Sequence, residues 1–374
     1  MVMVIMVVFG STHAQTLDWL KIHGFGGWAY AKTNGNNFLI GNEDGNWRTS
    51  QFALNLTANP YSKLSINTQL FLQSGLQQDD IELDYVFGEW AFVDAFRLRI
   101  GKIKSPIGLY SEIYDVGTLR PFYMLPVGMY YGPGLFPKSY VGLGATGNIV
   151  LNEKFEFQYD LLFGEMDFQT FKLEMPIGFN PITGPVMGKV NFTPIGREVI
   201  GGKITVLPII QGLKIGFSYL NMDIWTSRDG GPLQRDDTIQ NRVYITSGHF
   251  EYLTDFISLR SELYAINEDV KTHGGYIEAA VMFLKNWQAG VSYDWYENTT
   301  ESSVERTMVK SLMDHSSIGL TLNYWVNPNL VLKASYYRVD GNGFAQPDWI
   351  HENYFAGTLE EKTNVFIAGT QFSF

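Results

Sequence analysis

Apolar and polar residues alternate one by one along many segments of the chain. One such segment covers residues 51–58 and a second covers residues 64–73, with a turn at residues 59–62 between them. Because successive side chains of a strand point to opposite faces, this alternation predicts a hairpin with one apolar and one polar face. The same pattern recurs at residues 155–163, 213–219, 287–295, 318–324, 330–336 and 366–374.

The connections between these segments alternate between short turns and long loops. Short turns are expected near residues 59–63, 93–95, 151–154, 208–212, 253–256, 284–286 and 326–329. Longer segments rich in Gly, Asn and Asp lie between them, at residues 32–47, 102–140, 165–197, 223–239, 297–314 and 339–362. Turns at one end and loops at the other are typical of an outer-membrane barrel. The spacing predicts an all-β fold, a transmembrane antiparallel β-barrel of about sixteen strands that encloses an aqueous channel.

A soluble jelly roll or sandwich is the main alternative to the barrel. Its apolar face would form an internal core, and its outward face would usually be charged. The polar face of these segments is instead largely Gln, Asn, Ser, Thr and Gly with isolated charges. A sandwich also gives no reason for short and long connections to alternate. The pattern therefore favours the barrel.

The first residues predict an export signal. Residues 1–9 form a short apolar run, and residues 12–14 (Thr-His-Ala) follow the small-x-small pattern that signal peptidase cleaves. A membrane-spanning helix would need roughly 20 apolar residues, so the run is too short for one. We therefore expect a signal peptide at residues 1–14 and a barrel domain at residues 15–374.

The last strand predicts how the barrel closes. Phe372 and Phe374 share a face that we expect to meet lipid, whereas Val365 and Ile367 are expected to point inward. Pairing of this strand with the strand near residues 20–31 would remove both edges of the sheet.

Composition and charge exclude several classes of function. Aromatic residues make up 15% of the chain, as expected where aromatic girdles mark both bilayer interfaces. There is no cysteine, so there is no disulfide, thiolate nucleophile or Cys-based metal site. The formal net charge of −11 argues against a nucleic-acid partner. The histidines are scattered and match no zinc or catalytic-triad spacing. We expect no cofactor, no metal and no enzymatic activity.

Alternation also predicts which charged residues of the strands face the lumen. The expected basic positions are Arg97, Arg99, Lys203, Lys214, Arg242, Arg260 and Lys333. The expected acidic positions are Glu82, Asp84, Glu156, Asp160, Glu262, Glu278 and Asp294. The wall is therefore mixed in sign.

The longest strand-free stretch, at residues 102–140, is the candidate functional site. It is rich in aromatics, Pro and Gly, and a loop of this length in a compact protein is normally functional or disordered. We expect it to fold inward and to narrow the channel, with Arg97, Arg99, Lys102, Lys104, Glu112, Asp115, Arg120 and Lys138 at the constriction. Basic residues outnumber acidic ones there, which favours anions. The alternative is that each basic residue only pairs with a nearby wall carboxylate.

The start of this stretch resembles a known family. Residues 99–112 (RIGKIKSPIGLYSE), with residues 115–117 and 120–122, resemble the fifth strand and inward-folded third loop of Gram-negative porins related to the phosphate-selective and dicarboxylate-selective types. The C-terminal Phe374 is similar to the terminal aromatic that the barrel-assembly machinery recognises in such proteins.

The resemblance implies a homotrimer in the outer membrane of a Gram-negative cell, in contact with outer-membrane lipids and lipopolysaccharide. It implies passive diffusion of small hydrophilic solutes, and the charges of the loop favour small anionic solutes such as phosphate or carboxylates over cations. A structural or adhesive barrel with a plugged lumen, whose extracellular loops bind a partner, is the alternative function.

Overall fold

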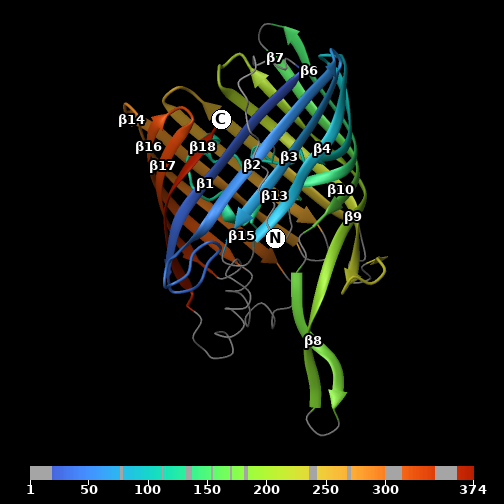
Figure 1. Cartoon of the computed structure of the whole chain (residues 1–374), viewed down its shortest axis with the longest axis vertical. Coiled ribbons are helices and arrows are strands. Elements are labelled where there is room, and N and C mark those ends of the chain that lie inside the picture. The colour runs from blue at the N-terminus through green and yellow to red at the C-terminus, as the bar shows by residue number, and fades with distance from the viewer. Residues whose placement is uncertain are drawn as a thin grey trace, which may run out of the picture.

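The structure is a computed structural model of the whole chain (Figure 1). It describes residues 19–75, 79–111, 113, 115–131, 137–152, 155–168, 171–180, 184–235, 242–267, 271–299, 314–341 and 360–374. The predicted signal peptide at residues 1–14 lies outside these ranges.

The described residues form one antiparallel sheet that closes on itself. Nearly every strand pairs with the next along the chain, except that β7 pairs with β9 and β10 with β12, and the pairing of the first strand with the last closes the barrel. The strands are β1 (Leu20–Asn34), β2 (Asn46–Tyr61), β3 (Leu64–Ser74), β4 (Asp79–Val93), β5 (Phe96–Lys104), β6 (Ser139–Asn152), β7 (Phe155–Asp167), β8 (Phe171–Asn180), β9 (Gly184–Pro208), β10 (Leu213–Arg228), β11 (Gln234–Arg235), β12 (Val243–Leu253), β13 (Ile257–Asn267), β14 (Lys271–Leu284), β15 (Trp287–Thr299), β16 (His315–Asn327), β17 (Leu330–Asp340) and β18 (Lys362–Ser373).

Sixteen of the described strands form the barrel wall. The two-residue strand β11 pairs with β10, and β8 forms a hairpin with the first part of β9. Figure 1 shows this hairpin extending beyond the end of the barrel, while β7 pairs directly with the rest of β9. The predicted strand number and the antiparallel closed barrel are therefore confirmed.

The outer face of the wall is apolar. In β5, Phe96, Leu98 and Ile100 are 41%, 38% and 62% exposed, and they alternate with Arg97 and Arg99 on the inner face. An exposed apolar surface that surrounds a closed barrel fits a lipid environment, because closure satisfies the backbone hydrogen bonds inside the sheet. Among the described residues, no helix is long and apolar enough to cross a membrane.

The expected short turns lie at one end of the barrel, but one of the expected long loops is wrong. Residues 165–197 are largely strand, since β7 runs to Asp167 and the β8–β9 hairpin follows. Leu173 pairs with Val190 and Phe171 with Phe192, so strand pairing continues past the barrel end. The Gly and Pro residues of this segment suggested a loop, but cross-strand pairing outweighs their low strand propensity.

The closing seam between β1 and β18 depends on two glycines. A Cβ on Gly24 would lie 2.3 Å from the ring of Phe374, and a Cβ on Gly26 would lie 2.8 Å from the ring of Phe372. The Phe374 ring reaches across β1 to Phe52 of β2, with 6.2 Å between the ring centroids. The two glycines thus let the last aromatic rings lie flat over β1 on the outer face.

The faces predicted for the last strand are confirmed. Phe366 and Phe374 are exposed on the outer face, whereas Val365 and Ile367 are fully buried inside. Their inward side chains contribute to a hydrophobic cluster inside the barrel, which also contains Ile107. The core of this protein therefore lies between part of the wall and an inward-folded loop.

Candidate constriction site

The segment between β5 and β6, residues 105–138, is called loop 3 below. It contains the 3-10 turn η1 (Gly117–Leu119) and the one-turn helix α1 (Val127–Tyr130). Its apolar side chains Ile107, Met124 and Met129 are almost fully buried among inward residues of the wall. Burial of an apolar strip against the wall explains why the loop folds into the barrel, and the predicted inward-folded third loop is confirmed.

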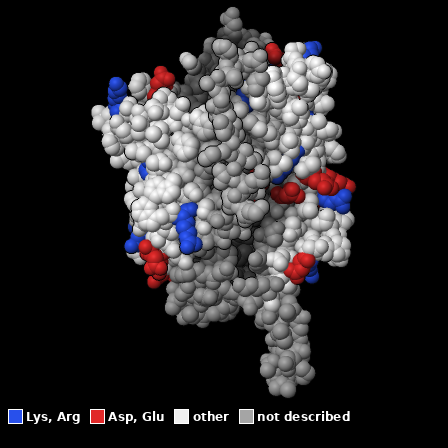
Figure 2. Space-filling view, in the orientation of Figure 1, with Lys and Arg blue, Asp and Glu red and all other residues white. Residues whose placement is uncertain are grey.

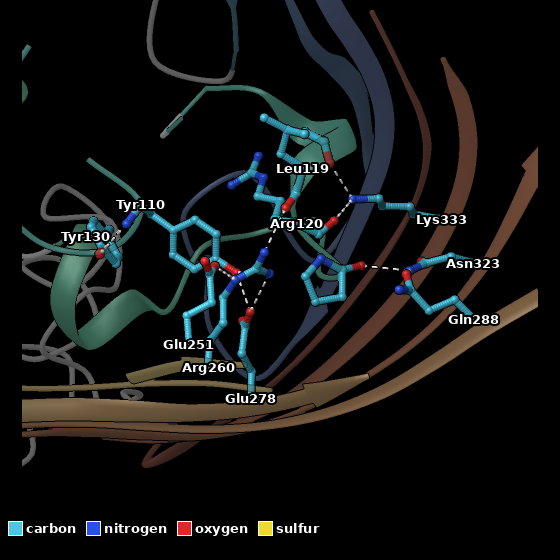
Figure 3. A network of polar contacts seen from close by, with 12 residues as sticks. Tyr110, Leu119, Arg120, Tyr130, Glu251, Arg260, Glu278, Gln288, Asn323 and Lys333 are labelled. Carbon is cyan, nitrogen blue, oxygen red and sulfur yellow. Dashed lines mark hydrogen bonds and ion pairs between the residues drawn. The ribbon is translucent and has the colours of Figure 1, made fainter. Parts of the chain in front are cut away.

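Wall side chains bind the irregular backbone of loop 3. The Lys333 ammonium on β17 donates to the carbonyl oxygens of Gly117 at 2.7 Å and Arg120 at 2.5 Å. Asn323 Nδ2 on β16 donates to the carbonyl oxygen of Pro121 at 2.8 Å. These bonds, drawn in Figure 3, supply the partners that buried backbone groups outside regular structure need.

Helix α1 is held against the wall through both backbone polar groups of Gly128, its amide and its carbonyl. The Gly128 amide donates to Asp294 Oδ1 on β15 at 2.9 Å, and Tyr264 on β13 donates its hydroxyl to the Gly128 carbonyl at 2.6 Å. A Cβ on Gly128 would lie 2.6 Å from the backbone oxygen of Trp295. Glycine is therefore required for the helix to approach the wall this closely.

A buried ion-pair cluster on β12 to β14 binds the first part of the loop (Figure 3). Arg260 Nε lies 2.8 Å from Glu251 Oε2, and its Nη1 lies 3.4 Å from Glu278 Oε1. Arg260 also donates to the Tyr110 hydroxyl at 3.0 Å and to the Leu119 carbonyl at 3.4 Å. Burial, and then the charge of Glu278, raise the pKa of Tyr110 well above its usual value, so Tyr110 stays protonated and donates to Glu278.

A second charge cluster fixes the two ends of loop 3. The Lys104 ammonium lies 2.6 Å from Asp84 Oδ2 and 3.0 Å from Asp115 Oδ2. Burial alone would raise the pKa of Asp115, but the positive charges of Lys104 and Lys138 outweigh it and hold this pKa below its usual value. Burial likewise opposes the charge of Lys138, yet the carboxylates led by Asp115 raise its pKa.

Arg97 and Arg99 face the lumen on the wall that loop 3 leaves uncovered. Arg99 Nε lies 2.6 Å from Glu89 Oε2, and its Nη1 lies 3.8 Å from Asp160 Oδ1. Arg97 is more exposed, and its guanidinium lies 3.9 Å from Glu89 and 3.4 Å from Asp94. Both arginines are therefore paired with carboxylates on their own side of the barrel.

Two of the predicted constriction residues do not join this site. Lys102 stands directly opposite Val86 and Val141, which are exposed on the outer face. Directly opposed residues share a face of the sheet, so Lys102 takes an outer-face position. Its ammonium lies 2.8 Å from the Leu83 carbonyl oxygen and 3.6 Å from Glu82 Oε1. Glu112 lies outside the described residues.

Several residues that hold loop 3 were recognised only as lumen-facing charges. Arg260, Glu278, Asp294 and Lys333 were placed on the inner wall by alternation, but no sequence signal connected them with the loop. Asn323 was not singled out at all. Within the part of the chain that the structure describes, no group of acidic or histidine side chains has the arrangement of a metal site.

Comparison with known proteins defines the class of fold. No protein-family model matches the chain, and no curated protein sequence matches it either. Solved structures do match along almost the whole length. They include the outer-membrane channel DcaP of Acinetobacter baumannii (TM-score 0.58, 7% identity, 95% of this chain and 97% of that chain) and OmpF of Salmonella typhi (TM-score 0.56, 12% identity, 95% and 97%). The anion-selective porin of Comamonas acidovorans also matches (TM-score 0.54, 10% identity, 95% and 99%).

The chain thus has the fold of the Gram-negative outer-membrane porins. At these identities the likeness concerns the fold alone. The apolar outer face of the barrel fits a lipid environment.

Proposed function

We propose that the protein is a porin that lets small hydrophilic solutes diffuse through the barrel, with a preference for small anions such as phosphate or carboxylates. The observation that carries this proposal is the uneven use of the lumen. Loop 3 lies against β13 to β18 and also contacts β1 and β2, whereas inner side chains of β5 and β7 keep contact with solvent. The side chains of Arg97, Arg99 and Asp160 are 40%, 25% and 17% exposed. Water inside the barrel beside the loop is the requirement for a diffusion channel.

The preference for anions is supported by the charges that loop 3 brings together. Arg120 and Arg260 lie close to one another at the covered wall, and Lys214 also pairs with Glu251, so the carboxylates Glu251 and Glu278 offset only part of the positive charge. A narrow passage walled by protein focuses such a field onto passing ions. The overall charge of −11 is no guide here, because several acidic residues lie outside the lumen, for example Asp94 and Glu165.

Contacts and assembly complete the proposal. The apolar outer face fits outer-membrane lipids, and the charged outer rim at the loop end, which includes Arg197 and Glu165 at 3.0 Å, fits lipopolysaccharide head groups. A homotrimer and the absence of enzymatic activity are proposed from the porin-like fold. Figure 2 shows a largely uncharged outer surface with charges gathered in a few places.

Conductance in planar bilayers tests the proposed function. We expect stepwise openings of the purified protein and, in a salt gradient, a reversal potential of the sign that anion selectivity gives. Folded protein that never conducts would contradict the proposal and favour a plugged structural or adhesive barrel. A reversal potential of the opposite sign would retain the channel and reject the anion preference.

A further inference from the structure

The guanidinium of Arg120 takes no part in anchoring loop 3. The residue is 7% exposed, and its Nε has no hydrogen-bond partner within the described part of the chain. Lys333 fixes this position through the Arg120 carbonyl oxygen rather than through the side chain. Figure 3 shows the guanidinium turned away from the wall strands, with no dashed line ending on it. A buried guanidinium normally donates hydrogen bonds to nearby acceptors. The Arg120 guanidinium can therefore still donate to an acceptor that the described residues do not supply.

The carboxylates nearest to Arg120 are already bound by other cations. Glu278 accepts from Tyr110 and pairs with Arg260, and Asp115 pairs with Lys104 at 3.0 Å. Both carboxylates interact electrostatically with Arg120 without a hydrogen bond to it. The positive charge of Arg120 is therefore only partly offset by them.

The cations around Arg120 add to its field. The Lys333 ammonium is 97% buried and bonds only neutral carbonyl oxygens, so no carboxylate pairs with it among the described residues. Arg260 shares Glu251 with Lys214, whose ammonium lies 3.1 Å from Glu251 Oε1. Arg120, Arg260 and Lys214 outnumber the carboxylates Glu251 and Glu278, so the cluster carries more positive than negative charge beside the unbonded guanidinium.

We propose that Arg120 is the binding site for an oxyanion, phosphate or a carboxylate, on the lumen side of loop 3. The planar fork of a guanidinium matches two oxygens of such a group, and Arg260 supplies further positive potential behind it. The proposal rests on the proposed anion-preferring channel and names the residue at which the solute stops.

Chloride current through the full-length protein in planar bilayers, measured while inorganic phosphate is added at constant ionic strength, tests the site. Phosphate is expected to reduce the chloride current of the natural protein. The concentration for half inhibition should rise about tenfold in Arg120→Gln, because one strong charge-assisted contact is lost. Arg197→Gln is the matched control, since it also removes one arginine but lies on the exposed outer rim, and it should leave this concentration unchanged. Titration with succinate instead of phosphate shows which oxyanion the site prefers.

Arg120→Lys separates the fork from the charge. It keeps the positive charge, so the reversal potential should stay as in the natural protein, but it loses the planar donors, so half inhibition should still require more phosphate. Because the Arg120 side chain makes no hydrogen bond in the described part of the chain, neither variant removes a contact that folding needs, and heat-modifiable migration in gels checks this.

Thermal unfolding in phosphate and in chloride of equal ionic strength gives a readout that does not depend on conduction. If the protein does not conduct, but phosphate raises its Tm and does not raise that of Arg120→Gln, the site stands and the proposed function fails. Equal phosphate sensitivity of the natural protein and Arg120→Gln in conducting channels would overturn the site and leave the channel. Absence of any phosphate effect on the natural protein, in current and in Tm, would also overturn the site.

Discussion

The inner wall of the barrel has two halves that use the same residue types differently. On the half covered by loop 3, Arg260 and Lys333 are 5% and 3% exposed, and their donors bind the loop and neighbouring carboxylates. On the uncovered half, Arg99 on β5 pairs with Glu89 on the neighbouring strand β4, and a quarter of the Arg99 side chain is exposed to solvent. The alternation of apolar and polar residues in the sequence predicts inward-facing charges of both signs on both halves. The position of one loop decides which of these charges become structural and which remain available to solutes.

Arg260→Met should give the largest effect, because it leaves Glu278 buried without its cation and Glu251 with Lys214 alone. Breaking a buried ion pair by removing one partner costs about 3–5 kcal/mol. We expect a lower free energy of unfolding in urea and a larger conductance, since the start of loop 3 loses its anchor. Arg99→Met on the uncovered wall should cost less than about 1 kcal/mol. Equal losses in the two variants would remove the distinction between the halves.

Asp115→Asn tests the anchor at the ends of the loop and should have an intermediate effect. The pKa of Asp115 is lowered in the folded protein, so its stabilising contribution is complete above the ordinary aspartate pKa of about 3.9 and is lost as the pH falls through the folded value. Loss of the bond to Lys104 should cost about 1.5–3 kcal/mol at neutral pH.

Urea unfolding of the natural protein and of Asp115→Asn at neutral pH, at pH 5 and below pH 3 checks this pH dependence. The difference in stability between the two proteins should be the same at neutral pH and at pH 5, and it should shrink only at the lowest pH. A difference that is already gone at pH 5 would mean that Asp115 is not held ionised by Lys104.

Lys102→Gln should give the smallest effect. Its register opposite Val86 and Val141 puts it on the outer face, away from the solute path. The reversal potential in a salt gradient should therefore stay unchanged, whereas Arg120→Gln removes a positive charge beside the channel and should make the channel less anion-selective. A shift as large as that of Arg120→Gln would place the Lys102 ammonium in the channel after all.

Most of the barrel follows from local pattern, because a strand that separates lipid from water must alternate. This is why Val365, Ile367 and Phe374 were assigned to the correct faces from the sequence. The pattern failed in the β8–β9 hairpin, which extends beyond the end of the barrel. A strand there does not separate lipid from water, so its sequence need not alternate between apolar and polar residues. The pattern also fails at Lys102, because the loop was expected to begin at residue 102, and the face of the sheet on which Lys102 lies was therefore not considered.

The constriction is harder to predict, because its contacts join residues far apart in the chain. Tyr110 meets Arg260 and Glu278, and Gly128 meets Asp294, across more than a hundred residues each. Composition indicated that loop 3 packs against something, but it held no information on which wall strands that would be. The unbonded guanidinium of Arg120 could be found only once the partners of every neighbouring carboxylate were known.

The glycine seam between β1 and β18 has a consequence for the timing of folding. Phe25 pairs with Ser373, so the contact that closes the barrel joins the two ends of the described chain. Contacts of such large sequence separation form late, because closing a long loop has a high entropic cost. Until Phe372 and Phe374 settle over Gly26 and Gly24, β1 and β18 are open sheet edges that can pair with other chains. The pairing of β1 with β18 thus decides when the sheet stops being prone to aggregation.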